Sequence, residues 1–249
     1  MAGLCGIPPG GSCRGADGQS PQRAGAATWT ACLTNVNGAA GKLNESYEQL
    51  RATLNGQHYV QPAIRSWVLT SLAEMAARAG RAEEASTLFR EALALDPADN
   101  YLLGAYADFL LDSGRPQEVR ALLQDKTRAD PLLLRYALAL KMLGSRELAV
   151  QVEQLRDRFE ASRRRGDRVH VREEARFTLH LLNDPKKALQ LAQENWQVQK
   201  EPADARILLE SALAAQDAAS IETMRAWLKK TVLEDIEIER LLAKPLQPN

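Results

Sequence analysis

The chain has 249 residues, of which 45% are hydrophobic, enough to build one continuous apolar core. Lysine plus arginine and aspartate plus glutamate both total 32, so the net charge is zero, and this balance argues against a nucleic-acid partner. No apolar run approaches the roughly 20 residues that cross a bilayer, and residues 1–26 lack the pattern of a secretory signal. We therefore expect no membrane span and, for the sequence as written, a cytoplasmic protein.

The N-terminal 26 residues differ from the rest in composition. They are rich in glycine and proline and carry almost no periodic apolar residues, so we expect a disordered lead over 1–26. Apolar residues at helical spacing then run from 27 to 243, followed by a tail at 244–249. The first of them, at about 29–36 and 43–54, predict a helical hairpin.

The next stretch, residues 66–99, predicts two amphipathic helices that meet at Gly80. A left-handed cap conformation past the first helix is cheap only for glycine, and Pro97 stops the second helix. Thirty-four residues later the pattern recurs over 100–133, with Gly114 matching Gly80 and Pro131 matching Pro97. Self-similarity at a fixed period is typical of a helical repeat array.

These two units resemble the tetratricopeptide repeat. The resemblance rests on a leucine pair, small residues at the helix contact, the inter-helix glycine, an Ala-x-x-x-Phe-x-x-Ala run and a closing proline. In this chain they are Leu69, Leu72, Ala73, Gly80, Ala85, Phe89, Ala92 and Pro97, followed in the second unit by Ala107, Gly114 and Pro131. The resemblance implies an all-α fold, a right-handed superhelical α-solenoid of stacked antiparallel helix pairs.

Beyond residue 131 the period loosens, but helical hairpins are still predicted. Helices are expected at about 133–143, 148–165, 171–182, 188–199, 203–215 and 219–232, the longer second one ended by Gly166 and Asp167. A short acidic helix at about 233–243 is expected to cover the exposed end of the array. The whole chain resembles a bacterial tetratricopeptide repeat protein of about six hairpins. Because no N-terminal cap is recognisable, it also resembles the C-terminal part of longer exported proteins, and it would then be periplasmic.

All three cysteines, Cys5, Cys13 and Cys32, lie in the first 32 residues. One interpretation pairs Cys13 with Cys32 on adjacent helices, which implies an oxidising compartment. The other leaves reduced thiols in a cytosolic protein. No close cysteine pair offers the spacing of a zinc site.

Sequence motifs give no support to catalysis. His170 is followed by Glu173 and Glu174 but lacks the second histidine of a metalloprotease helix, and His180 is too far away to share its face. The glycine-rich residues 10–14 do not fit a nucleophile elbow, and no phosphate-binding loop is present. We therefore expect a non-enzyme without a cofactor or metal.

The densest charge lies between residues 156 and 176, with eight arginines against five acids. One interpretation is a solvated helix end with weak ion pairs. The other is that Arg163, Arg165 and Arg172 receive a carboxylate or acidic peptide, because guanidinium suits bidentate pairing.

By resemblance to tetratricopeptide repeats, the first helix of each hairpin lines the concave surface. The residues expected there are Trp67, Thr70, Glu74, Tyr101, Gly104, Asp108, Arg135 and Leu138. Aromatic anchors and carboxylates together suit an extended or helical peptide, with a cationic one as one option. In the alternative, Trp67 and Tyr101 pack between hairpins. The lysine–asparagine clamp of chaperone-binding members is missing, which argues against an acidic chaperone tail.

The leading hypothesis is a non-catalytic scaffold that binds a protein or peptide on its concave surface. The alternative is a structural or assembly subunit of a bacterial envelope complex. Large apolar patches on the convex side would favour that alternative.

Overall fold

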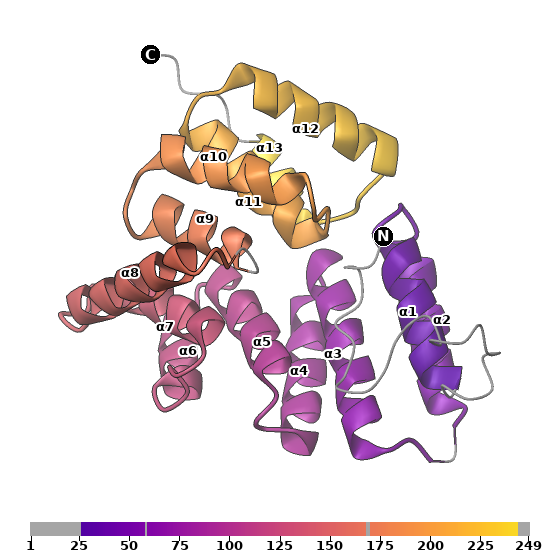
Figure 1. Cartoon of the computed structure of the whole chain (residues 1–249). Coiled ribbons are helices and arrows are strands. Elements are labelled where there is room, and N and C mark those ends of the chain that lie inside the picture. The colour runs from indigo at the N-terminus through magenta and orange to yellow at the C-terminus, as the bar shows by residue number, and fades with distance from the viewer. Residues whose placement is uncertain (1–25, 58, 168–169, 244–249) are drawn as a thin grey trace. The chain divides into compact units, whose positions relative to one another are not determined.

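The computed structural model describes residues 26–57, 59–167 and 170–243 (Figure 1). Within these ranges the chain is all-α, with thirteen helices and no strand. The described residues fall into two compact units. Unit 1 holds 26–106 and 228–236, and unit 2 holds 107–227 and 237–243. None of the described helices is long and apolar enough to pass through a membrane.

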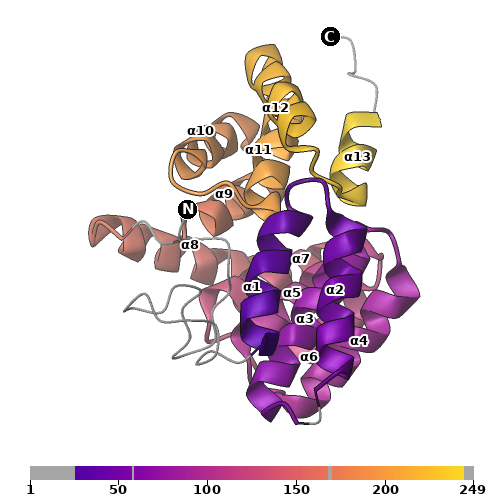
Figure 2. The same cartoon turned by 90° about the vertical axis from the view of Figure 1, so that its right-hand side faces the viewer.

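Twelve of the described helices follow one another as six helix pairs. They are α1 (Ala26–Gly38) with α2 (Leu43–Asn55), α3 (Pro62–Arg78) with α4 (Ala82–Leu95), α5 (Asn100–Asp112) with α6 (Pro116–Leu123), α7 (Asp130–Met142) with α8 (Leu148–Arg164), α9 (Val171–His180) with α10 (Pro185–Trp196), and α11 (Pro202–Ala214) with α12 (Ala218–Thr231). A last helix, α13 (Ile236–Ala243), follows. Below, α1, α3, α5, α7, α9 and α11 are called the first helices and their partners the second helices. The structure thus confirms the expected helical repeat, and both views show α1 to α4 side by side (Figures 1 and 2).

Each first helix is followed by one residue in the left-handed region. These residues are Gly41, Gly80, Gly114, Gly144, Asn183 and Gln216. At Gly80 the backbone N–H of Arg81 reaches back to the carbonyl of Ala76 at 2.8 Å, as in a Schellman cap. The turn thereby satisfies carbonyls at the helix end and reverses the chain, so the second helix packs against the first.

The core of unit 1 uses the residues that carry the repeat pattern. Ala73 and Ala85 are fully buried, and Leu69, Leu72 and Ala92 are at most 3% exposed. Phe89 stacks on Tyr106 with ring centroids 5.2 Å apart. Small residues at the α3–α4 contact therefore let the two helices approach closely while the larger side chains fill the layers beside them.

Unit 2 is built on α7, whose residues 132–134 and 136–140 are all buried. Phe159 of α8 packs against Phe177 of α9 at 5.3 Å, and Trp196 meets Trp227 edge to face at 4.8 Å. Pro131, expected to close a helix, instead lies in the first turn of α7, where its missing N–H needs no partner. Pro97 follows the end of α4, as expected.

The C-terminal end departs from the sequence expectation. A helix over 233–243 was expected to cover the last hairpin, but α13 begins at Ile236. Residues 228–236, which run from the last turn of α12 to the first residue of α13, belong to unit 1. Val232 touches the turn at Gly41, and Ile236 lies beside the turn at Gly80. This segment therefore packs on the ends of the first two hairpins, a contact between residues far apart in sequence that no periodicity encodes.

Candidate functional site

The predicted partner-binding residues are divided between the two units, and each unit is described by itself. Trp67, Thr70, Glu74 and Tyr101 lie in unit 1, and Asp108, Arg135, Arg163, Arg165 and Arg172 lie in unit 2.

In unit 1 the first helices α3 and α5 present Tyr101 and Glu74 to solvent. Tyr101 is 48% exposed, and its hydroxyl donates to the Glu74 carboxylate at 2.8 and 2.9 Å. Trp67 is only 5% exposed and Thr70 only 1%, with the Thr70 hydroxyl donating to the Ser66 carbonyl at 2.8 Å. Trp67 and Thr70 thus pack within the core of unit 1, while Tyr101 and Glu74 form the accessible surface. We call these two residues the Tyr101–Glu74 pair.

Arg78 lies one helical turn beyond Glu74 on α3. Its Nη2 donates to the carbonyl of Gly38 at 3.0 Å. Burial lowers the pKa of this guanidinium, and the carboxylates of Asp235, Glu74 and Glu234 oppose that effect. Arg78 therefore ties α3 to the last residue of α1.

In unit 2, Asp108 bridges two arginines. Its carboxylate accepts from Arg135 of α7 and from Arg176 of α9, both at 2.6 Å. Burial raises the pKa of Asp108, but the two guanidiniums outweigh it and bring that pKa down to about 2. Asp108 is consequently charged throughout the neutral range and holds three first helices together.

A second set of ion pairs continues along the same helices. Asp112 accepts from both terminal nitrogens of Arg206 at 2.6 and 2.7 Å, and Arg206 Nε donates to Glu210 at 2.8 Å. Glu210 also bonds His180 Nε2 at 2.9 Å. Burial raises the pKa of Glu210, but the hydrogen bond with His180 and the charge of Arg206 outweigh that effect and lower the pKa to about 2.

We call this group the inner-helix ion network. It consists of Asp108, Asp112, Arg135, Arg176, His180, Arg206 and Glu210. Each of its arginines already binds a carboxylate of the chain, so the network acts as a tie between first helices. Of this group, sequence reasoning placed only Asp108 and Arg135 on the binding surface. His180 was considered as a metal ligand and set aside, and the other four were not assigned to any site. The sequence signal that could have pointed to them is the presence of charged residues on first helices that are otherwise apolar.

The predicted arginine cluster is likewise engaged by the chain's own groups. Arg172 pairs with Glu201 at 3.0 Å and with the buried Asp204 at 3.3 Å. Burial lowers the pKa of Arg172, but these carboxylates and that of Glu173 outweigh it and raise that pKa. Arg163 pairs with Glu174, and the exposed Arg165 donates to the Ser162 hydroxyl at 3.2 Å. To bind an acidic partner, Arg163 and Arg172 would first have to break their ion pairs with carboxylates of this chain.

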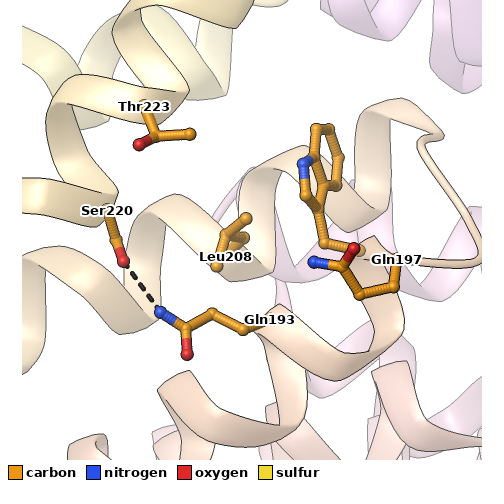
Figure 3. Close-up of a pocket in the computed structure, with 6 residues that line it drawn as sticks. Gln193, Gln197, Leu208, Ser220 and Thr223 are labelled. Atoms are coloured by element: carbon orange, nitrogen blue, oxygen red, sulfur yellow. Dashed lines mark hydrogen bonds between the residues drawn. The ribbon is translucent and has the colours of Figure 1, made fainter.

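A small pocket lies between α10, α11 and α12 (Figure 3). Its volume is about 280 Å³, and Gln193 Nε2 donates to the Ser220 hydroxyl across it at 2.9 Å. The lining residues are Gln193, Trp196, Gln197, Leu208, Ser220 and Thr223. Since none of them is ionisable, this lining supplies no acid, base or charged nucleophile.

Cys32 lies on α1, is 7% exposed and is part of a disulfide. Cys5 and Cys13 lie outside the described residues, so pairing with Cys13 stays a prediction. Within the described part of the chain, no cluster of three or more His, Cys, Asp or Glu residues is placed to hold a metal ion.

Left-handed turns between paired helices, small residues at the helix contacts and an all-helical core define a helical repeat protein. The tetratricopeptide repeat family model matches residues 22–151, more than half of the chain. The chain belongs to the tetratricopeptide repeat family, whose repeats are generally protein-interaction scaffolds. The match spans α1 to α7 and the residues that carry the repeat pattern. No curated protein and no solved structure matches the chain.

Proposed function

We propose that this protein is a non-catalytic scaffold that binds a protein or peptide on α3 and α5 of unit 1. The Tyr101–Glu74 pair is its contact for a cationic side chain. The observation that carries this proposal is the exposure of Tyr101, 48%, beside a carboxylate on the first helices. In tetratricopeptide repeats these helices present the surface that meets a partner.

The chemistry of the pair favours lysine or arginine. An aromatic ring attracts a cation over its face, by about 0.5 to 2 kcal/mol depending on exposure. The Glu74 carboxylate adds a charge-assisted hydrogen bond. A Tyr anchor of this kind concentrates binding energy in a few atoms, as at other protein interfaces.

Unit 2 offers less to the same partner. Its equivalent helices carry the inner-helix ion network, in which arginines and carboxylates satisfy one another. A charged peptide would have to break pairs that are only partly exposed, and leaving one member unpaired is costly. This contrast supports placing the contact in unit 1.

A random 16-residue peptide library selected on the full-length protein tests the proposal. We expect enriched peptides to carry lysine or arginine, and Tyr101→Ala and Glu74→Gln each to weaken them about tenfold, which corresponds to 1.4 kcal/mol. Tyr59→Ala is the matched control, because Tyr59 is 78% exposed in the same unit but lies outside the helices. Equal binding by Tyr101→Ala and Tyr59→Ala, or no enrichment of basic peptides, would refute it.

The envelope-assembly alternative requires contiguous apolar surface on the second helices. Across the described second helices, large apolar side chains are exposed only singly, as Leu95 on α4 and Val150 on α8. Scattered single residues are normal on a folded surface, so the peptide-binding scaffold is the better supported function.

A further inference from the structure

The pocket between α10, α11 and α12 lies wholly in unit 2, and the contact proposed in unit 1 does not use it. Leu208 of α11, which is 3% exposed, supplies an apolar part of its lining. Gln193 of α10 and Gln197 directly after α10 contribute carboxamides, and Ser220 and Thr223 of α12 contribute hydroxyls. The volume of about 280 Å³ is at the small end of the range for ligand pockets, so a single side chain fits it better than a large cofactor.

The polar side chains of this lining keep unused hydrogen-bonding capacity. Gln193 Nε2 donates to the Ser220 hydroxyl at 2.9 Å, which leaves Gln193 Oε1 and the Ser220 proton available. The Thr223 hydroxyl donates to the carbonyl of Ala219 at 2.8 Å, so its oxygen can still accept. Within the described residues the Gln197 carboxamide has no hydrogen-bond partner, and Figure 3 shows it directed into the pocket. The lining therefore offers donors and acceptors together.

A charged ligand group does not match this lining. A carboxylate only accepts hydrogen bonds and an ammonium only donates them, so either would leave part of the lining unpaired. A carboxamide donates and accepts at once, as the lining does. A sugar ring also does both, but it binds most strongly to an open aromatic face. Trp196 offers no such face, because it is 9% exposed, meets the Trp227 ring at 4.8 Å and has Lys200 Nζ 5.7 Å from its ring centroid.

We propose that this pocket binds the carboxamide of a glutamine or asparagine side chain that a protein partner presents. Gln197 pairs with this carboxamide through one donor and one acceptor, and Gln193 and Thr223 take its remaining hydrogen bonds. Leu208 contacts the methylene groups next to the amide. A protein source agrees with the scaffold role of tetratricopeptide repeats. This inference goes beyond the contact proposed in unit 1 and does not depend on it.

The test is a nuclear magnetic resonance titration of the full-length protein labelled with nitrogen-15. The probe is the blocked tripeptide acetyl-Ala-Gln-Ala-N-methylamide, and its isostere carries glutamate in place of glutamine. At about 20 mM probe, enough to occupy a site with a low-millimolar Kd, we expect the side-chain amide signals of Gln193 and Gln197 to shift. The isostere should bind at least about fivefold more weakly, because its carboxylate has no donor. Absence of shifts with the glutamine probe, or equal binding of the isostere, would overturn the proposal.

A substitution at Gln197 removes the main contact without disturbing the fold, since its amide bonds nothing else in the described chain. Gln197→Ala should weaken the glutamine probe about fivefold, the loss expected for one neutral hydrogen bond. Gln190→Ala is the matched control, because Gln190 is an exposed glutamine of α10 outside the lining. Affinity of Gln197→Ala equal to that of Gln190→Ala would contradict the assigned contact.

A second probe separates the ligand classes. Methyl α-glucoside should leave the signals of Gln193 and Gln197 in place at the concentration used for the tripeptide. If the sugar shifts them at a lower concentration than the glutamine probe does, the carboxamide assignment is wrong. Tyr101→Ala should not change the titration with the glutamine probe, so the contact proposed in unit 1 and this pocket can each fail without the other.

Discussion

A single left-handed residue closes the first helix of every described hairpin, and its identity changes along the chain. Glycine serves in the first four hairpins, whereas Asn183 and Gln216 serve in the last two. Asparagine tolerates this conformation through local hydrogen bonding of its short side chain, but glutamine has no such advantage. The last hairpin therefore carries backbone strain at Gln216 that the earlier hairpins avoid.

Exchanging residues at these turns should change stability in opposite directions. Gly114→Ala should cost about 1 to 2 kcal/mol, because a Cβ is disfavoured at this φ although nothing lies within 4 Å of it. Gln216→Gly should gain roughly 0.5 to 1 kcal/mol, since relieved strain exceeds the added entropy of the unfolded chain. Urea unfolding followed by circular dichroism measures both. A stabilising Gly114→Ala would contradict the assignment of the turn.

The turn residues also show which parts of the fold can be predicted from the sequence. Gly80 and Gly114 are one repeat length apart, and glycine favours a left-handed turn, so the sequence predicted both turns. Gln216 is not a residue type that signals such a turn. Helix positions were predictable because apolar spacing is local. The links from Asp108 to Arg176 and from Asp112 to Arg206 were not, because they join residues 68 and 94 positions apart. The same limit applies to the burial of Trp67, which depends on what packs over α3.

At the scale of elements, first and second helices have different roles. First helices such as α3 and α7 bury long consecutive runs, because neighbours cover them on more than one face. Second helices such as α4 and α10 bury one stripe and expose the other. Polar groups on a first helix must therefore find partners on other first helices, and the inner-helix ion network supplies those partners in unit 2.

The pair between α5 and α11 is suited to a double-mutant cycle. Asp112→Ala leaves Arg206 with Glu210 alone in a partly buried site, so we expect a loss of about 2 to 4 kcal/mol. Adding Arg206→Ala should recover part of that loss, giving a coupling energy of about 1 to 3 kcal/mol. Thermal or urea unfolding provides the four stabilities.

The control for this cycle is the pair between Arg115 and Glu118. Its atoms are as close, 2.6 Å, but both side chains are at least one third exposed. Its coupling energy should stay below about 1 kcal/mol. A coupling at Asp112–Arg206 no larger than this would show that the network contributes nothing beyond surface pairing.

For the whole molecule, basic and acidic residues are equal in number, but some of the acids lie in surroundings that shift their pKa values strongly. Lysine plus arginine equals aspartate plus glutamate, so no net repulsion opposes folding near neutral pH. Asp108 and Glu210 differ from exposed acids because their pKa values are lowered to about 2 by neighbouring cations despite burial. Acid should therefore act on stability through these two groups as well as through the growing positive charge.

The direction follows from linkage. Both carboxylates have lower pKa values in the folded chain than their ordinary 3.8 and 4.5, so the unfolded chain binds protons first as the pH falls. Their contribution is fully present above about pH 5 and is lost as the pH falls through 4 toward 2, roughly 2 to 3 kcal/mol for each group. Urea midpoints at pH 7, 5, 3.5 and 2.5 should record this decline. Glu210→Gln should flatten the decline, whereas Asp217→Asn, at a carboxylate whose pKa is lowered by hydrogen bonds from Ser220 and by no neighbouring cation, should leave most of it. If Glu210→Gln and the wild type lose stability in parallel, Glu210 is not a source of the acid sensitivity.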